Sequence, residues 1–228
     1  MEHSADEMMT VAAARELRDG EVCFVGIGLP STAANLARGR HAPGVVLIYE
    51  SGTIGSKPTR LPLSIGDGDL AETADSVVSV PEIFNYWLQG GRIDVGFLGA
   101  AQIDRHGNLN STVIGSYSEP KVRLPGAGGA PEIAAHTRRV ITIIRQSPRS
   151  FVAELDFKTS LGAQDQVVIT DLGLLRRHDE LVLEALHPGV TLEQAREATA
   201  WDLQVADDLE TTDPPTADEL AALRELHA

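Results

Sequence analysis

The chain has 228 residues, and its 33 acidic and 19 basic side chains leave a formal net charge of −14 at pH 7. This charge disfavours nucleic acid and anionic membranes as general partners. Apolar residues make up 43% of the sequence, which is enough for a sizeable core. No stretch approaches about 18 consecutive apolar residues. Residues 1–7 lack the pattern of a secretory signal, so we expect a cytoplasmic protein without membrane contacts.

Metal and disulfide chemistry find little support in the composition. Cys23 is the single cysteine and lies in the apolar run 22–25, where we interpret it as a small buried hydrophobic residue. The seven histidines are dispersed, and the acidic cluster at Asp67, Asp69 and Glu72 lacks the histidines and the spacing of a metal site. We therefore expect no bound metal.

The first half of the chain alternates between helical and strand patterns. Ser4 and Glu7 have the spacing of a capping box, ahead of a helical pattern that Gly20 ends. Strands are predicted over 22–27 and 45–49, separated by a helix over 32–38. This β-α-β spacing indicates a parallel pair. A helix over 81–88 and a strand over 93–98 follow, whereas 71–80 is ambiguous.

The second half is richer in strands. The ranges 151–161 and 167–172 are interpreted as a pair of edge strands, and Thr191 and Thr216 each precede a helix. We predict one α/β domain over 1–228, an open and mostly parallel sheet with flanking helices, and a C-terminal helical appendage from about residue 187. Further strands are predicted over 109–114, 139–144 and 181–186.

A glutamate directly follows the second predicted strand. Glu50 stands where open α/β sheets carry their chemistry, and Ser51, Gly52 and Gly55 form a turn behind it. From the residues alone two interpretations stay open. Glu50 is either a hydrogen-bonding loop residue or a catalytic carboxylate.

Two glycine-rich loops accompany this glutamate. Gly26-Ile-Gly28 is half of a dinucleotide fingerprint with Ser31 at the third position, which favours a tight strand-to-helix turn over NAD binding. Gly126-Ala-Gly128-Gly129 precedes a short helix. It is either a flexible turn or a cradle of backbone N–H groups, reinforced by the helix N-terminus, for a developing negative charge.

Taken together, these segments resemble the β (B) subunits of class I CoA-transferases. The fold of that family is shared with sugar-phosphate isomerases. The likeness covers nearly the whole chain and is densest from residue 20 to 160. It rests on residues 26–37, 47–52, 63–69, 87–94, 99–104, 107–110, 124–132 and 187–190.

The resemblance implies that Glu50 is the catalytic nucleophile of a ping-pong reaction through a glutamyl-CoA thioester. It also implies that Gly126, Gly128 and Gly129 supply backbone N–H groups to the oxyanion. Ser51, Gly52 and Gln102 are weaker candidates for substrate binding. Coenzyme A is then a substrate and a covalent intermediate, and no permanently bound cofactor is expected.

The resemblance further implies an α subunit as partner, in a heterodimer or an α2β2 assembly, with acyl-CoA and dicarboxylic acids as substrates. Transfer of CoA from succinyl-CoA to 3-oxoadipate is the leading expectation. Another acceptor acid such as glutaconate, a CoA-thioester hydrolase, or a non-catalytic sensing subunit are the alternatives. One departure from the family is a connection of only five residues, Ala163 to Val167, where a longer glycine-rich loop is expected.

Overall fold

The computed structural model describes residues 2–227, and its first elements form the β-α-β unit that the sequence predicts. Strands β1 (Val22–Phe24) and β2 (Val46–Ile48) pair in parallel, with helix α2 (Leu29–Gly39) between them in the chain. Gly28 caps α2 with φ 82° and ψ −138°, a conformation that only glycine adopts without strain. The glycine of the half-fingerprint is therefore required by the strand-to-helix turn.

The chain forms two compact units, and unit 1 draws on both ends of the sequence. Unit 1 comprises the described residues up to Phe97, His136–Arg138 and the described residues from Pro215 onward. Unit 2 comprises Leu98–Ala135 and Arg139–Pro214. The segment from residue 187, predicted as a helical appendage, is divided between the two units and contains a long strand besides its helices.

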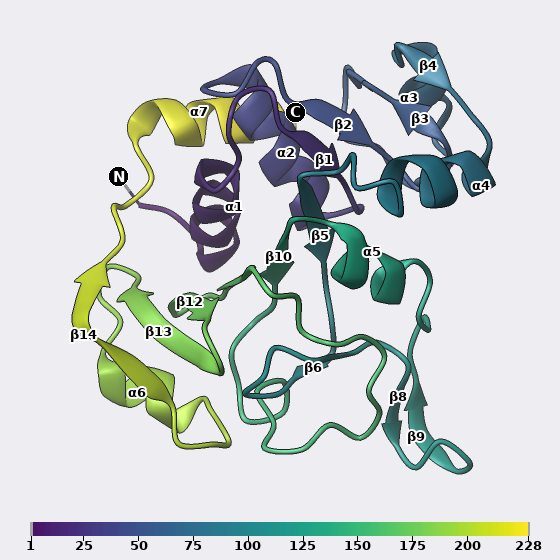
Figure 1. Ribbon diagram of the computed structural model, residues 1–228. Coiled ribbons are helices and arrows are strands. Elements are labelled where there is room, and N and C mark those ends of the chain that lie inside the picture. Colours follow the sequence, from purple (N-terminus) through teal and green to yellow (C-terminus); the bar gives the residue numbers. More distant parts are fainter. Residues whose placement is uncertain (1, 228) are drawn as a thin grey trace. The chain divides into compact units, whose positions relative to one another are not determined.

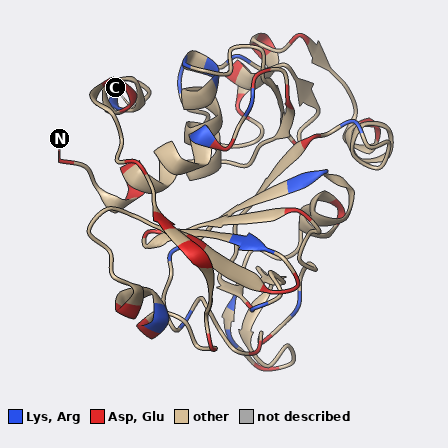
Figure 2. Ribbon diagram, turned by 60° about the vertical axis from the view of Figure 1, so that its left-hand side comes forward, with Lys and Arg blue, Asp and Glu red and all other residues tan. Residues whose placement is uncertain are grey.

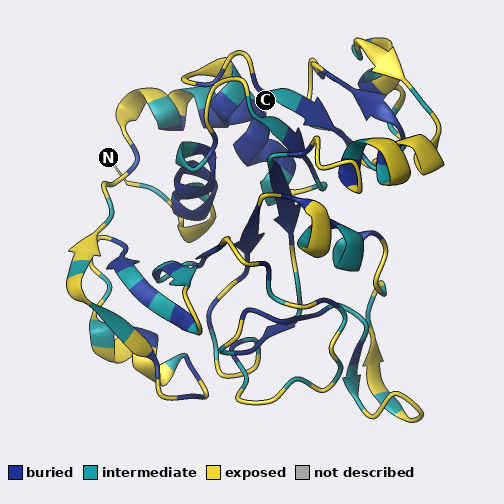
Figure 3. Ribbon diagram, in the orientation of Figure 1, coloured by how far each residue is buried: buried dark blue, intermediate teal, exposed yellow. Residues whose placement is uncertain are grey.

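Unit 1 has a sheet in the order β5-β1-β2-β3-β4. Its strands β1, β2 and β5 are parallel, and β3 and β4 continue the sheet in antiparallel fashion. The helices α1, α2 and α7 lie side by side (Figure 1), and α1 and α2 are the more deeply buried of the three (Figure 3). Besides β1, α2 and β2, the elements of unit 1 are α1 (Ala5–Arg15), β3 (Thr53–Ile54), α3 (Gly68–Glu72), β4 (Ser76–Val77), α4 (Val80–Glu82), the π-helix η1 (Ile83–Leu88), β5 (Val95–Leu98) and α7 (Ala217–Glu225).

Unit 2 has its own strand order, β14-β13-β12-β11-β10. Strands β10 and β11 are parallel, β12 and β13 follow as an antiparallel meander, and β14 returns parallel to β13. Two small hairpins, β6–β7 and β8–β9, stand beside this sheet. The elements are β6 (Gln102–Ile103), β7 (Leu109–Asn110), β8 (Val113–Gly115), β9 (Pro120–Arg123), α5 (Ala130–His136), β10 (Arg139–Ile143), β11 (Gln166–Ile169), β12 (Gly173–Arg177), β13 (Leu181–Leu186), α6 (Leu192–Glu197) and β14 (Gln204–Thr211).

The predicted pair of edge strands over 151–161 and 167–172 is wrong. Strand β11 lies between β10 and β12, and all four of its residues are buried, as expected for an interior strand. The range 151–161 forms only isolated bridges, at Phe151 and Ser160. In the order of unit 2, β14 is an outermost strand, and its Asp207, Asp208 and Glu210 are exposed. Figure 2 colours acidic residues such as these red. Charged side chains of this kind discourage an edge from pairing with another chain.

The predicted α/β class and its open, mostly parallel sheet are confirmed, with the antiparallel strands added to parallel pairs in each unit. The capping box predicted at Ser4–Glu7 is also confirmed, and the helix predicted after Thr216 begins with a capping box of Thr216 and Glu219. Among residues 2–227, no helix combines the length and the apolar character needed to cross a bilayer.

Two ion pairs join the C-terminal helix α7 to α1. Arg15 donates to both carboxylate oxygens of Glu219, at 2.8 and 2.7 Å, and Arg224 donates from Nε to Glu7 at 2.7 Å. The hydrogen bond from Arg224 and the N–H of Ser4 lower the pKa of Glu7 to about 2. Burial alone would raise the pKa of Glu219, but the bonds from Arg15 and Thr216 outweigh it and lower that pKa to about 2.

We expect unit 1 to lose stability between about pH 4.5 and pH 2, with α7 detaching from α1. Both carboxylates have a folded-state pKa below the ordinary value of 4.5, so their contribution is complete above that pH and declines as they are protonated. The double variant Glu7→Gln/Glu219→Gln should unfold more easily than the parent at pH 7, and this difference should shrink as the pH falls to 2 and vanish below it. Urea unfolding at a series of pH values measures this difference. The exposed Glu225→Gln on the same helix is the control, and an unchanged gap between parent and double variant at pH 2 would contradict the assignment.

Candidate active site

Glu50 lies at the carboxyl edge of the parallel strands of unit 1. Phe24 of β1 is opposite Ile48 of β2 and Gly96 of β5, so the three strands end at the same edge. Beyond these partners the chain continues to Gly26–Gly28 after β1 and to Tyr49 and Glu50 after β2. The register therefore places the first glycine-rich turn and the glutamate at one edge of the sheet.

The glutamate occupies a three-residue hairpin loop between β2 and β3. The carbonyl of Tyr49 accepts from the N–H of Gly52 at 3.0 Å, and the N–H of Tyr49 donates to the carbonyl of Thr53 at 3.1 Å. Glu50, Ser51 and Gly52 lie between these bonds, in the pattern of a type I turn closed by a left-handed glycine. Glu50 is half-buried at the first of the three positions. A hairpin this short leaves little freedom to the backbone of Glu50.

Gly52 is required at the end of this loop for two reasons. Its φ is +109°, and a Cβ atom there would lie 2.1 Å from the carbonyl oxygen of Val78. The N–H of Val78 donates to the carbonyl of Gly52 at 2.9 Å, so the segment that follows β4 supports the loop directly. The Oγ of Ser51 is buried and has no hydrogen-bond partner among the described residues. The sequence predicted the turn but neither β3 nor its support by residue 78.

Tyr49, directly before the glutamate, is fully buried and bonded to α2. Its hydroxyl lies 3.2 Å from the Oγ of Ser31, and Asn35, one turn further along α2, donates to the carbonyl of Ser31 at 2.9 Å. Arg38 donates to the Oδ1 of Asn35 at 3.1 Å. Burial raises the pKa of Tyr49 and lowers that of Arg38, so the phenol is held in its neutral form. The sequence analysis did not identify Ser31, Asn35 and Arg38 as a set. Their spacing of four and three residues along one helix is the signal that could have identified them.

The second glycine-rich loop belongs to unit 2. Gly126 has φ +103° and Gly128 φ +48°, and the space where a Cβ would stand is open at both. The loop is anchored at Ser111, whose carbonyl accepts from the N–H of Gly126 and whose hydroxyl donates to the carbonyl of Gly126, each at 2.9 Å. Within the described residues, the N–H groups of Ala127, Gly128 and Gly129 make no hydrogen bond. The backbone is thus approachable at Gly126 and Gly128, whereas Gly129 is buried.

Gln102 is buried, and its amide bonds are internal to unit 2. Its Oε1 accepts from Asn110 at 2.7 Å and from the N–H of Asp156 at 3.2 Å, and its Nε2 donates to the carboxylate of Asp156 at 2.9 Å. Gln102 therefore joins β6 and β7 to the segment around residue 156. One N–H of the amide is left for any further partner.

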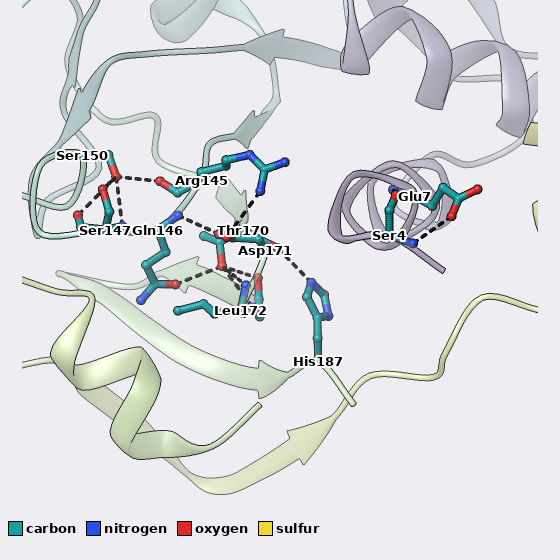
Figure 4. A network of polar contacts seen from close by, with 11 residues as sticks. Ser4, Glu7, Arg145, Gln146, Ser147, Ser150, Thr170, Asp171, Leu172 and His187 are labelled. Atoms are coloured by element: carbon teal, nitrogen blue, oxygen red, sulfur yellow. Dashed lines mark hydrogen bonds and ion pairs between the residues drawn. The ribbon is translucent and has the colours of Figure 1, made fainter. Parts of the chain in front are cut away.

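A second buried polar network lies where β10 and β11 end (Figure 4). The Oγ of Thr170 donates to Gln146 at 2.9 Å and accepts from the N–H groups of Leu172 and Gly173. Gln146 donates onward to Thr199 and to the carbonyl of Ala195. Because these bonds satisfy the buried groups involved, the network fixes strand ends and presents nothing to a ligand.

The predicted site residues thus fall into two groups. Glu50, Ser51 and Gly52 share one hairpin loop of unit 1. Gly126, Gly128 and Gly129 share one loop of unit 2, and Gln102 lies in β6 of the same unit. In the short connection after Leu161, the N–H of Gly162 donates to the Oδ1 of Asn108 at 3.0 Å.

Comparison with known proteins identifies the family of the chain. Residues 6–198 match the coenzyme A transferase family. The B subunit of the 3-oxoadipate CoA-transferase of Pseudomonas knackmussii is 58% identical over 99% of this chain and 94% of that protein. Its alignment spans 244 residues, more than the 228 of this chain, so the relative carries residues that this chain lacks. The B subunit of the glutaconate CoA-transferase of Acidaminococcus fermentans is 34% identical over 91% of this chain and 87% of that protein.

The fold of the chain is also similar to that of solved structures. The decarboxylase AibA/AibB has a chain with a TM-score of 0.90 and 29% identity, which covers 98% of this chain and 94% of its own. The glutaconate coenzyme A-transferase of Acidaminococcus fermentans reaches the same TM-score and identity, with the same coverage. The matched residues include the hairpin of Glu50 and the loop of Gly126–Gly129. The chain belongs to the coenzyme A transferase family, among its B subunits.

Proposed function

We propose that this chain is the B subunit of a CoA-transferase that moves CoA from succinyl-CoA to 3-oxoadipate. The proposal is carried by one observation. A chain 58% identical to the B subunit of a 3-oxoadipate CoA-transferase holds a half-buried glutamate on a closed hairpin loop at the carboxyl edge of its sheet. A carboxylate is a weak nucleophile in water and needs such orientation to react with a thioester.

In the first half-reaction the Glu50 carboxylate attacks the thioester carbonyl of succinyl-CoA. The C–S bond breaks and CoA leaves as the thiolate, so a mixed succinyl-glutamyl anhydride forms. The thiolate then attacks the glutamyl carbonyl, releases succinate and leaves a glutamyl-CoA thioester. The carboxylate of 3-oxoadipate enters next, and the same steps in reverse yield 3-oxoadipyl-CoA and free Glu50. The atoms and charges of these steps balance without an oxidant, a metal or an additional acid.

Each of these steps passes through a tetrahedral oxyanion, for which we assign Gly126, Gly128 and Gly129. The support is that the N–H groups of Gly128 and Gly129 are without partners in the described residues, whereas Gly126 is anchored to Ser111. Gly126 then acts by holding the loop in shape. Donors fixed before the reaction stabilise developing charge without reorganisation.

We assign Ser51, Gly52 and Gln102 a supporting role in substrate binding. An α subunit completes the active site. Gly52 closes the hairpin, and the unpartnered Oγ of Ser51 lies beside the glutamate in sequence. Gln102 has one amide N–H left for a substrate carboxylate. With a net charge of −14, this chain is poorly suited to hold the anionic CoA alone. An α subunit, in a heterodimer or an α2β2 assembly, supplies the remaining contacts.

We expect Glu50→Ala, purified with its α subunit, to lose at least about 10⁴-fold in kcat, because covalent enzymes lose this much when their nucleophile is removed. Incubation of the parent complex with succinyl-CoA alone should attach CoA to Glu50, in a bond cleaved by hydroxylamine and detected by mass spectrometry of the peptide. Glu72→Ala, at an exposed position of the same unit, is the matched control.

Full transferase activity in Glu50→Ala, or a CoA adduct on another residue, would reject Glu50 as nucleophile. The acceptor is tested separately, by measuring thioester formation from succinyl-CoA against 3-oxoadipate, glutaconate and acetate. A preference for glutaconate or acetate would leave the mechanism in place and replace the acceptor.

We expect Gly128→Ala to lower kcat, because its methyl group would stand beside the N–H groups assigned to the oxyanion and hinder their contact with it. The methyl group would enter open space beside the N–H groups at a backbone φ of +48°, so it would disturb the approach of the substrate more than the fold. Gly189→Ala is the matched control, since Gly189 also has a positive φ, of +86°, with open space at its Cβ position. Equal activity of the two variants would show that the loop at 126–129 has no part in catalysis.

A further inference from the structure

A continuous chain of polar side chains runs along one side of α2 to the residue before the candidate nucleophile. Ser31, Asn35 and Arg38 stand four and three residues apart. The Nδ2 of Asn35 donates to the main-chain carbonyl of Ser31 at 2.9 Å and to its Oγ at 3.5 Å, and Arg38 donates to the Oδ1 of Asn35 at 3.1 Å. Ser31 is 1% exposed and Asn35 4%. Arg38 also donates to the carbonyl of Pro58 at 3.4 Å and lines a cavity of about 530 Å³. The chain thus begins at a cavity and ends at the hydroxyl of Tyr49.

Tyr49 is held at its side chain and at its backbone at the same time. The hydroxyl is bonded to Ser31, while the N–H and the carbonyl close the hairpin through Thr53 and Gly52. Glu50 is the next residue, so any rotation of Tyr49 about its backbone displaces the glutamate. The fully buried ring and the bonded hydroxyl together prevent that rotation.

We propose that the Tyr49 hydroxyl, with Ser31 and Asn35, positions Glu50 for attack on the thioester, and that Arg38 keeps Asn35 in the orientation this requires. The inference rests on the proposed function, since it concerns the rate of that reaction. Tyr49 is a positioning residue and makes no contact with the reacting atoms. Nucleophilic attack depends on alignment, and a displacement of about 1 Å is enough to lower a rate by about 10²-fold.

The alternative is that the hydroxyl merely satisfies a polar group that burial would otherwise leave unpaired. The two roles differ in what the first half-reaction reports. In a rapid-quench experiment with succinyl-CoA, the amplitude of CoA release counts the competent sites, and its rate constant measures the chemistry at each site. A positioning role lowers the rate constant at full amplitude. A purely structural role lowers the amplitude and the melting temperature and leaves the rate constant unchanged.

The experiment uses the complex with its α subunit and the variant Tyr49→Phe, which keeps the ring and removes the hydroxyl. We expect kcat and the rate constant of the first half-reaction to fall about tenfold, the value of one neutral hydrogen bond. KM for succinyl-CoA should change by less than about twofold, because binding before the reaction does not depend on alignment. Tyr86→Phe is the matched control, since Tyr86 lies in the same unit and is 55% exposed.

The connection through α2 is tested by a double-mutant cycle. Ser31→Ala should cause a similar loss, and Tyr49→Phe/Ser31→Ala should lose no more than either single variant, because both remove the same bond. Additive losses, or an unchanged rate constant in Tyr49→Phe, would overturn the proposal. Asn35→Asp tests the far end, since a carboxylate there would pair with Arg38 and withdraw the amide donor from Ser31, so the rate constant should again fall.

Failure of the positioning role can be distinguished from failure of the proposed function. If Glu50→Ala is active, the assignment of Glu50 as nucleophile is wrong, whatever the double-mutant cycle of Tyr49 and Ser31 shows. If Glu50→Ala is inactive while Tyr49→Phe equals the parent in rate constant, amplitude and melting temperature, the transferase stands and the positioning role is rejected.

Discussion

The closure of the hairpin at Tyr49 and Gly52 is the constraint on which the candidate site of unit 1 depends. Two backbone bonds, of 3.0 and 3.1 Å, enclose Glu50 and Ser51 in a loop too short to move independently of the sheet. An acyl-glutamyl anhydride would be destroyed by water, so a carboxylate used in this way must already stand in its reactive position before substrate binds. The surrounding elements act on this loop, with α2 on the side chain of Tyr49 and residue 78 on Gly52.

Glycine serves two opposite purposes in the two loops. At Gly52 a Cβ would lie 2.1 Å from a backbone oxygen, so the missing side chain permits close packing and immobilises the loop. At Gly126 and Gly128 the corresponding space is open, so the missing side chain leaves the backbone accessible from outside. Close packing therefore restricts the backbone of the first loop to one conformation. In the second loop, the N–H groups of Ala127, Gly128 and Gly129 make no hydrogen bond within the described residues, whereas that of Gly126 is bonded to Ser111.

The sequence predicted the elements whose signals are local. The capping residues Ser4, Thr191 and Thr216, the parallel pair of β1 and β2, and the position of Glu50 at a strand end all follow from short patterns. Strand β3 has only two residues and depends on pairing with β2 and β4, so no periodicity within it could be detected. Strand β11 was misplaced because a run of three apolar residues, 167–169, does not reveal whether one or two neighbouring strands flank it. The network from Arg38 to Tyr49 joins two segments, and only the fold brings the phenol to Ser31.

The division of the chain has a consequence for its synthesis. Helix α7 is joined to α1 through Glu219 and Arg224, yet about two hundred residues separate them in sequence. Since a ribosome adds roughly 5–20 residues per second, the interval between synthesis of α1 and synthesis of α7 is on the order of ten seconds or more. During that interval all of unit 2 is produced, whereas unit 1 still lacks a helix. Synthesis of unit 1, which carries Glu50, therefore begins before that of unit 2 and ends after it.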